Sequence, residues 1–147
     1  MKQLLNKAIT LAAQKHDGQF DKAGQPYILH LMTVLTLTNS QDEEVQCIAV
    51  LHDIIEDTKT TYRELVEHGF SIRVIQGVQA LTKQPGQTYD EYKDAVKSNP
   101  DAILVKLADL EHNSDIRRLK GVSEKDIQRT AKYHQFYQEL KLCMSQN

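Results

Sequence analysis

The sequence predicts an all-α fold, with a single compact domain of about seven or eight helices spanning residues 1–147. Three observations predict the helical class and the domain number. Apolar residues recur at intervals of three and four along nearly the whole chain, as they do on one face of an α-helix. No stretch of four or more residues alternates cleanly between apolar and polar side chains, as a half-buried strand would. A chain of 147 residues is long enough for one hydrophobic core.

Eight segments carry this helical spacing. We expect them over residues 4–17, 27–38, 42–57, 60–69, 71–82, 88–98, 101–119 and from 123 toward the C-terminus. The first segment is defined by a stripe of leucine and alanine. Pro26 suits the first turn of the second, and the acidic run at residues 42–44 suits the positive end of the third. Gly69 closes the fourth segment, and Ser71 is a typical N-cap for the fifth.

The remaining segments are also bounded by residues typical of helix ends. The turn sequence KQPGQ, at residues 83–87, separates the fifth segment from the short polar sixth. Pro100 opens the seventh segment, and Gly121 ends it. The last begins at Ser123, in a sequence that resembles a capping box.

Composition and charge exclude several classes of protein. The net charge of −2 provides no basic field for nucleic acid. No apolar run approaches the roughly 20 residues that a membrane helix needs, and the charged first 15 residues have no signal-peptide core. Cys47 and Cys143 lie far apart and fit no metal spacing, which is typical of reduced thiols. We therefore expect a soluble cytoplasmic protein; its oligomeric state stays open.

The stretch CIAVLHDIIEDT, residues 47–58, places polar residues inside an apolar helix. His52, Asp53, Glu56 and Asp57 share one face at about 100° per residue. A helix that is apolar all round is buried all round, so His52 and Asp53 are expected inside and the acidic pair at the rim. A buried carboxylate needs a partner, which is either a basic side chain or helix N-terminus, or a divalent metal.

Two further segments favour the metal. Asp109 lies on the inward stripe of AILVKLADLEHN, residues 102–113, and His30 lies on the core face of residues 27–38. Three buried helices therefore each offer a ligand. Two neutral imidazoles and two carboxylates balance a divalent ion, and this mixed set suits Mn²⁺ or Fe²⁺, with positions left for water and substrate.

The ordered motifs AAQKHDGQFDKAGQPYILH, AVLHDIIEDT and VKLADLEHN resemble the HD-domain metal-dependent phosphohydrolases. In particular, they resemble the hydrolase domain of RelA/SpoT-type enzymes and of small stand-alone alarmone hydrolases, which remove the 3′-pyrophosphate from (p)ppGpp with Mn²⁺. The resemblance covers residues 8–119. It implies that the metal ligands are His30, His52, Asp53 and Asp109. It also implies that Glu56 and Asp57 act on the attacking water and that Asn113 holds the nucleotide, with Lys22 as a phosphate contact.

Two departures from the family pattern bear on the substrate. Asp21 and Asp115 stand where the family usually has arginines near the nucleotide; Leu31, in place of a proline, is a local change. Three hypotheses follow: a (p)ppGpp-type pyrophosphohydrolase, an HD hydrolase of another nucleotide or small phosphoester, and a non-catalytic HD ligand-binding module. The intact ligand set argues against the third.

Other charged residues have plainer interpretations. We expect His16 to be a structural histidine bonded to a loop, and His112 to pack near the site or support a ligand. The basic cluster of Arg117, Arg118 and Lys120 is interpreted as a solvated helix end, with phosphate attraction as the alternative.

Overall fold

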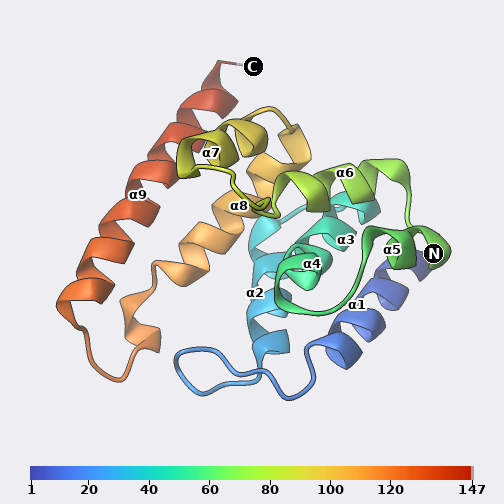
Figure 1. The fold of residues 1–147 in the computed structure, drawn as a ribbon, viewed down its shortest axis with the longest axis horizontal. Coiled ribbons are helices and arrows are strands. Elements are labelled where there is room, and N and C mark those ends of the chain that lie inside the picture. Colours follow the sequence, from blue (N-terminus) through green and yellow to red (C-terminus); the bar gives the residue numbers. More distant parts are fainter. Residues whose placement is uncertain (147) are drawn as a thin grey trace.

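The computed structural model describes residues 1–146, which form α-helices joined by short loops (Figure 1). In chain order the helices are α1 (Gln3–Lys15), α2 (Tyr27–Thr38), α3 (Glu43–Leu51), α4 (Ile54–Asp57), α5 (Tyr62–Glu67), α6 (Ile72–Ala80), α7 (Tyr89–Lys97), α8 (Pro100–Asn113), the 3₁₀ helix η1 (Ile116–Arg118) and α9 (Glu124–Ser145). Within residues 1–146 the only β-type pairing is an isolated bridge between Phe20 and Pro26. The prediction of an all-α fold is confirmed.

Helix α3 lies at the centre of the core. Every residue from Val45 to Leu51 is buried, because α3 contacts α1, α2, α6 and α8. On the side of α6 the approach is especially close. A Cβ atom at Gly77 would lie 2.4 Å from Cδ1 of Ile48, so only glycine fits there without a shift. The helix that ends next to His52 is therefore held from several sides.

Helices α8 and α9 form one flank of the molecule. α9 runs along the edge farthest from α1 (Figure 1, red) and packs against α7 and α8 through the buried Phe136 and Leu140. It begins with a capping box in which Ser123 and Asp126 bond each other's backbone N–H groups. Although α9 has 22 residues, it is too polar to span a bilayer, and no helix within residues 1–146 is both long and apolar enough to do so.

The third predicted helix, over residues 42–57, is interrupted. The structure has α3 and α4 in its place, with a break at His52 and Asp53. Nδ1 of His52 lies 2.7 Å from the carbonyl oxygen of Ala49, so a side chain bonds an acceptor within the last turn of α3. Asp53 has φ −102° and ψ 0°, in the sparsely populated bridge region. The apolar pattern continues across the break, which is why spacing alone predicted one helix.

The seventh predicted helix, over residues 101–119, is shorter than expected. α8 ends at Asn113, and the chain turns before η1. The carboxylate of Asp115 accepts a hydrogen bond from the backbone N–H of Arg117 at 3.1 Å, which stabilises this turn in place of further α-helix. The turn brings Arg118 back toward the end of α8.

Candidate metal centre

His30, His52 and Asp109 converge from α2, the end of α3 and α8. All three are buried, and their ligand atoms lie within 4.8 Å of one another. Oδ1 of Asp109 is 3.0 Å from Nε2 of His30 and 3.3 Å from Nε2 of His52. Oδ2 of Asp53 lies 3.1 Å from Nε2 of His52 and 4.0 Å from Nε2 of His30. The four residues expected to bind a metal are therefore neighbours.

The hydrogen bond at Nδ1 of His52 fixes its tautomer. The carbonyl of Ala49 can only accept, so the proton of the neutral ring lies on Nδ1 and the lone pair on Nε2. Nε2 is buried and has no hydrogen-bond partner among the residues that the structure describes. An imidazole nitrogen in this state is the usual ligand of a metal ion.

His112 is the corresponding hydrogen-bond partner at Nδ1 of His30. The two rings stack with centroids 5.0 Å apart and an angle of 15° between their planes, and their Nδ1 atoms are 2.7 Å apart. Burial, with the nearby charges of Arg118 and His30, lowers the pKa of His112 to about 4. His112 is therefore neutral near pH 7, and its Nδ1 can accept a hydrogen bond from the Nδ1–H of His30. In that tautomer the lone pair of His30 is on Nε2 and is available to a cation, whereas in the other tautomer Nε2 donates to Oδ1 of Asp109 at 3.0 Å.

This set of atoms fits a divalent cation. Two imidazole lone pairs and two carboxylates face one another, and acceptors at such distances repel unless a positive charge lies among them. Without a metal, a proton on the His52 ring supplies the positive charge. Burial lowers the pKa of His52, but Asp53 and Asp109 outweigh it and raise the pKa well above its ordinary value. The structure thus contains a possible His/Asp site for a divalent metal.

Tyr27 and Lys106 support the two carboxylates, and neither was singled out from the sequence as a site residue. The hydroxyl of Tyr27 donates to Oδ2 of Asp53. Nζ of Lys106 lies 2.9 Å from Oδ2 of Asp109. Burial opposes ionisation of Asp109, but Lys106 and the two histidines hold its pKa well below the usual range. Lys106 and Asp109 are three residues apart on α8, a spacing that places them on one helix face and was the available signal.

Glu56 and Asp57 lie at the rim, as expected, and are exposed. Oε1 of Glu56 accepts from the backbone N–H of Lys83 at 2.7 Å. Although Asp57 is at the surface, its surroundings partly desolvate the carboxyl group, and this, followed by the negative charges of Asp53 and Glu56, raises the pKa of Asp57 to about 6. A carboxylate with a raised pKa accepts a proton more readily near neutral pH than an ordinary aspartate does.

His16 is buried behind this rim. Its Nδ1 lies 2.8 Å from Oε1 of Gln19, and Nε2 of Gln19 donates to the carbonyl of Asp57 at 2.7 Å. The histidine is therefore bonded to the loop that follows α1, in agreement with its expected structural role. Gln19 connects this loop to the acidic pair.

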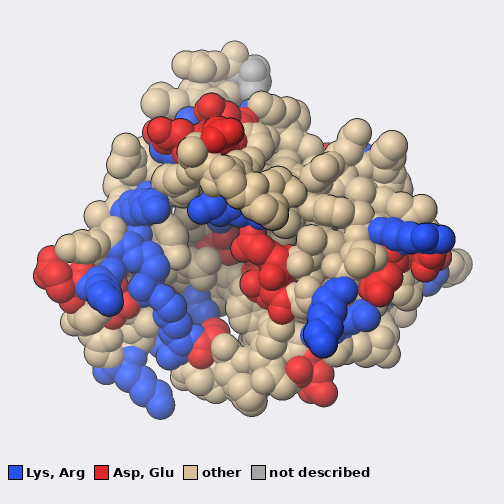
Figure 2. Space-filling view, in the orientation of Figure 1, with Lys and Arg blue, Asp and Glu red and all other residues tan. Residues whose placement is uncertain are grey.

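A cavity of about 260 Å³ opens beside the metal centre. Among its lining residues are Lys22, His30 and Asn113, and the amide of Asn113 donates to Oδ1 of Asp109 at 3.0 Å. Figure 2 shows acidic residues in the hollow at the middle of this face and Lys and Arg side chains along one side of it. An anionic substrate would meet these cations when it enters the hollow.

The two aspartates that depart from the family pattern are both held by arginines. Oδ2 of Asp21 lies 2.8 Å from Arg118, and Oδ1 of Asp115 lies 2.9 Å from Nε of Arg117. Neither aspartate therefore presents an uncompensated negative charge to the cavity.

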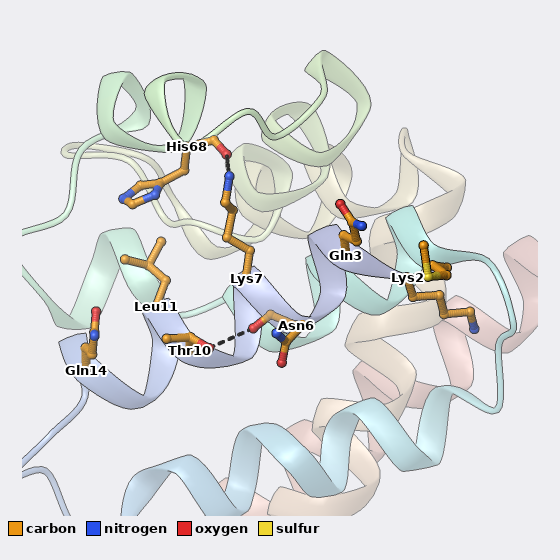
Figure 3. A pocket seen from close by; sticks show the side chains of 9 residues that line it. Lys2, Gln3, Asn6, Lys7, Thr10, Leu11, Gln14 and His68 are labelled. Atoms are coloured by element: carbon orange, nitrogen blue, oxygen red, sulfur yellow. Dashed lines mark hydrogen bonds between the residues drawn. The ribbon is translucent and has the colours of Figure 1, made fainter.

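Another hollow, of about 580 Å³, lies on α1 and beside His68 (Figure 3). Its polar side chains are those of lysine, glutamine, asparagine, threonine and one histidine. Lys7 donates to the carbonyl of His68 at 3.1 Å across it. With no carboxylate in its lining, this hollow offers no ligand set like that of the metal centre.

Comparisons with known proteins agree with this geometry. The family model described as "HD domain" matches residues 8–140. The chain is 36% identical over 115 residues to the guanosine-3′,5′-bis(diphosphate) 3′-pyrophosphohydrolase of Aquifex aeolicus, covering 71% of this chain and 16% of that protein. It is 33% identical over 122 residues to the bifunctional (p)ppGpp synthase/hydrolase SpoT of Escherichia coli, covering 74% and 17%. The chain thus matches less than a fifth of the length of these relatives.

A solved structure has the same fold. It is described as "A metazoan ortholog of SpoT hydrolyzes ppGpp and plays a role in starvation responses", with a TM-score of 0.75 and 24% identity. The match covers 97% of this chain and 92% of that one. The family model spans most of the sequence, and the chain belongs to the HD domain family.

Proposed function

We propose that this chain is a divalent-metal-dependent phosphohydrolase that removes a pyrophosphate from a (p)ppGpp-like nucleotide. The observation that carries the proposal is the convergence of His30, His52, Asp53 and Asp109 beside an acidic pair, in a chain of the HD family. The names of the relatives in Aquifex aeolicus and Escherichia coli supply the substrate class.

Each residue has a role in this proposal. His30, His52, Asp53 and Asp109 would hold the ion, which when bound lowers the pKa of water and offsets charge on phosphate oxygens. Mn²⁺ is the proposed ion because the donor set mixes nitrogen and oxygen; Fe²⁺ suits the same set.

The acidic pair would orient the attacking water and accept its proton. Glu56 is held through Oε1 by the backbone N–H of Lys83, and among residues 1–146 its other oxygen has no hydrogen bond that would compete with orienting the attacking water. Asp57, whose pKa is raised to about 6, is suited to take a proton from that water near neutral pH. Asn113 and Lys22, both in the lining of the cavity, would contact the nucleotide.

A second candidate is an HD hydrolase of another nucleotide or small phosphoester. Asp21 and Asp115 favour it, because the arginines beside them are already engaged in ion pairs. A substrate with fewer phosphates would need fewer free cations.

A panel of nucleotides incubated with Mn²⁺ tests both candidates. The proposal expects ppGpp to release pyrophosphate and not phosphate, with the Glu56→Gln protein as the inactive control. Release of phosphate alone, or turnover of nucleoside monophosphates in preference to ppGpp, would favour the second candidate. No turnover of any phosphoester by the metal-loaded protein would reject both.

A further inference from the structure

The ion pair of Asp21 and Arg118 lies in the wall of the candidate site. Asp21 belongs to the loop before α2, and Arg118 is the last residue of η1, 97 positions later. Their side chains are only 10% and 22% exposed. Both residues line the cavity of about 260 Å³ and also a neighbouring cavity of about 390 Å³, and His30 lines both as well. The pair therefore borders both cavities, next to His30, one of the proposed metal ligands.

Arg118 is also connected to the proposed metal ligands. One terminal nitrogen donates to the carbonyl of His112 at 3.0 Å and lies 3.4 Å from Oδ1 of Asn113. The amide of Asn113 in turn donates to Asp109 at 3.0 Å. A guanidinium has five N–H donors, and its Nε takes part in none of these contacts. Arg118 is thus placed beside the centre with donors to spare.

Asp21 is fixed independently of Arg118. Its Oδ1 accepts from the backbone N–H groups of Ala23 and Gln25, each at 2.9 Å, and these bonds close the loop. Only Oδ2 faces Arg118. If the pair opens, the long arginine side chain is the partner able to move, while the aspartate stays with its loop.

The neighbouring cationic side chains are less well placed than Arg118 to contact a phosphate in the cavity. The guanidinium of Arg117 bonds both oxygens of Asp115 and is 88% exposed. Arg129 is held by Asp126 at the start of α9. Lys22 is exposed on the loop. Arg118 alone among these residues is bonded to Asn113 and lines both cavities next to His30.

We infer that Arg118 is the specificity-determining cation of the site, and that it exchanges the carboxylate of Asp21 for a phosphate oxygen of the substrate. The inference rests on the proposed phosphohydrolase function and deepens it. An arginine from η1 would then supply the charge that position 21 lacks. Asp21 would act as a competitor that keeps Arg118 in place until a more highly charged group displaces it.

The test measures binding of inorganic pyrophosphate by calorimetry, with all proteins in the same excess of Mg²⁺. Arg118→Gln should weaken binding about 10-fold or more, because it removes a charge-assisted hydrogen bond. Asp21→Asn, which keeps an acceptor for the loop, should tighten binding about 5-fold by removing the competing charge. In the variant with both substitutions, Asp21→Asn should no longer tighten pyrophosphate binding, because position 118 has no arginine for it to release.

Arg117→Gln is the matched control. This variant removes the same charge from the adjacent position. If direct contact with Arg118 matters more than the overall electrostatic field of the site, the affinity for pyrophosphate should change less than about 2-fold. Equal losses in the two glutamine variants would overturn the inference. So would unchanged binding in Arg118→Gln, the absence of a gain in Asp21→Asn, or a gain that persists in the double variant.

Two further measurements separate this inference from the proposed function. Arg118→Lys keeps the charge and is the variant to measure if Arg118→Gln does not fold. It should lose less pyrophosphate affinity than a variant with a neutral residue at position 118. If the protein turns over no nucleotide while pyrophosphate binding follows the expected pattern, the proposed function fails and the assignment of Arg118 stands. If ppGpp is hydrolysed with a KM that Arg118→Gln leaves unchanged, the function stands and the inference fails.

Discussion

Replacing Lys106 by methionine should destabilise the metal-free protein and strengthen metal binding at the same time. Nζ of Lys106 lies 2.9 Å from Asp109, and the two side chains are 17% and 7% exposed. Removing one partner of a buried pair costs about 3–5 kcal/mol. We expect about 3 kcal/mol, the lower end of that range, because the imidazole of His52 stays 3.3 Å from the same carboxylate. At about 3 °C per kcal/mol, Tm should fall by roughly 9 °C.

Metal should reverse part of this loss. Lys106 places a positive charge beside a proposed ligand, so a divalent ion loses a repelling neighbour in the Lys106→Met protein. An affinity for Mn²⁺ at least about tenfold tighter would add about 1.4 kcal/mol to the stabilisation by saturating metal. Thermal and urea unfolding with and without Mn²⁺ measure both effects.

Lys93→Met is the control for the lost lysine. Lys93 lies 3.0 Å from Glu139 and, like Lys106, near the ring of Phe136, but it is remote from the ligand set. Its replacement should cost less than that of Lys106, because Glu139 is 29% exposed and keeps Lys97 at 3.7 Å, and it should leave the response to Mn²⁺ unchanged. The reasoning is refuted if metal-free Lys106→Met unfolds at the wild-type temperature, or if Mn²⁺ stabilises both proteins equally.

Three other predictions concern the site. His52→Ala should lose bound metal and also stability, because Asp53 and Asp109 then face each other without the imidazole; equal metal content by elemental analysis would contradict the ligand assignment. Glu56→Gln should keep the metal while kcat falls by roughly 10²-fold or more, because the acidic pair that acts on the attacking water loses one carboxylate. Since the folded-state pKa of Asp57 is raised to about 6, its ionisation destabilises the metal-free fold as pH rises from about 4 to 6. Asp57→Asn should therefore raise the free energy of unfolding at pH 7.5 but not at pH 3.5, and an equal change at both pH values would contradict this.

Helical periodicity was sufficient to predict the fold class and to place the proposed ligand residues in the interior. His30, His52 and Asp109 each occupy a core-facing position of an apolar helix, and such positions in a small all-α domain must meet in one interior. Of the alternatives posed for a buried carboxylate, Asp109 has the basic partner, Lys106, and it also lies within the His/Asp cluster that could hold a metal.

Periodicity could not predict features that depend on one particular contact. The break between α3 and α4 follows from the bond between the His52 ring and the carbonyl of Ala49, in a stretch whose composition favours one continuous helix. The ion pair of Asp21 and Arg118 joins residues 97 positions apart, and no local rule connects them. From sequence alone, Asp21 predicts a loss of positive charge, whereas the structure pairs it with Arg118.

The close approach of Gly77 to Ile48 connects helix α6 to the proposed metal site. Ile48, whose side chain occupies the space a Cβ at position 77 would need, lies one helical turn before His52 on α3. A methyl group on α6 would push the side chain of Ile48, which is β-branched and closely packed, so the strain would reach α3. A displacement of α3 would change the position of the His52 imidazole relative to Asp53 and Asp109. Gly77, which has no side chain and touches none of the proposed ligands, is therefore a position from which a substitution would reach the proposed metal site through Ile48, so a search for variants with altered metal use would include the far side of the core.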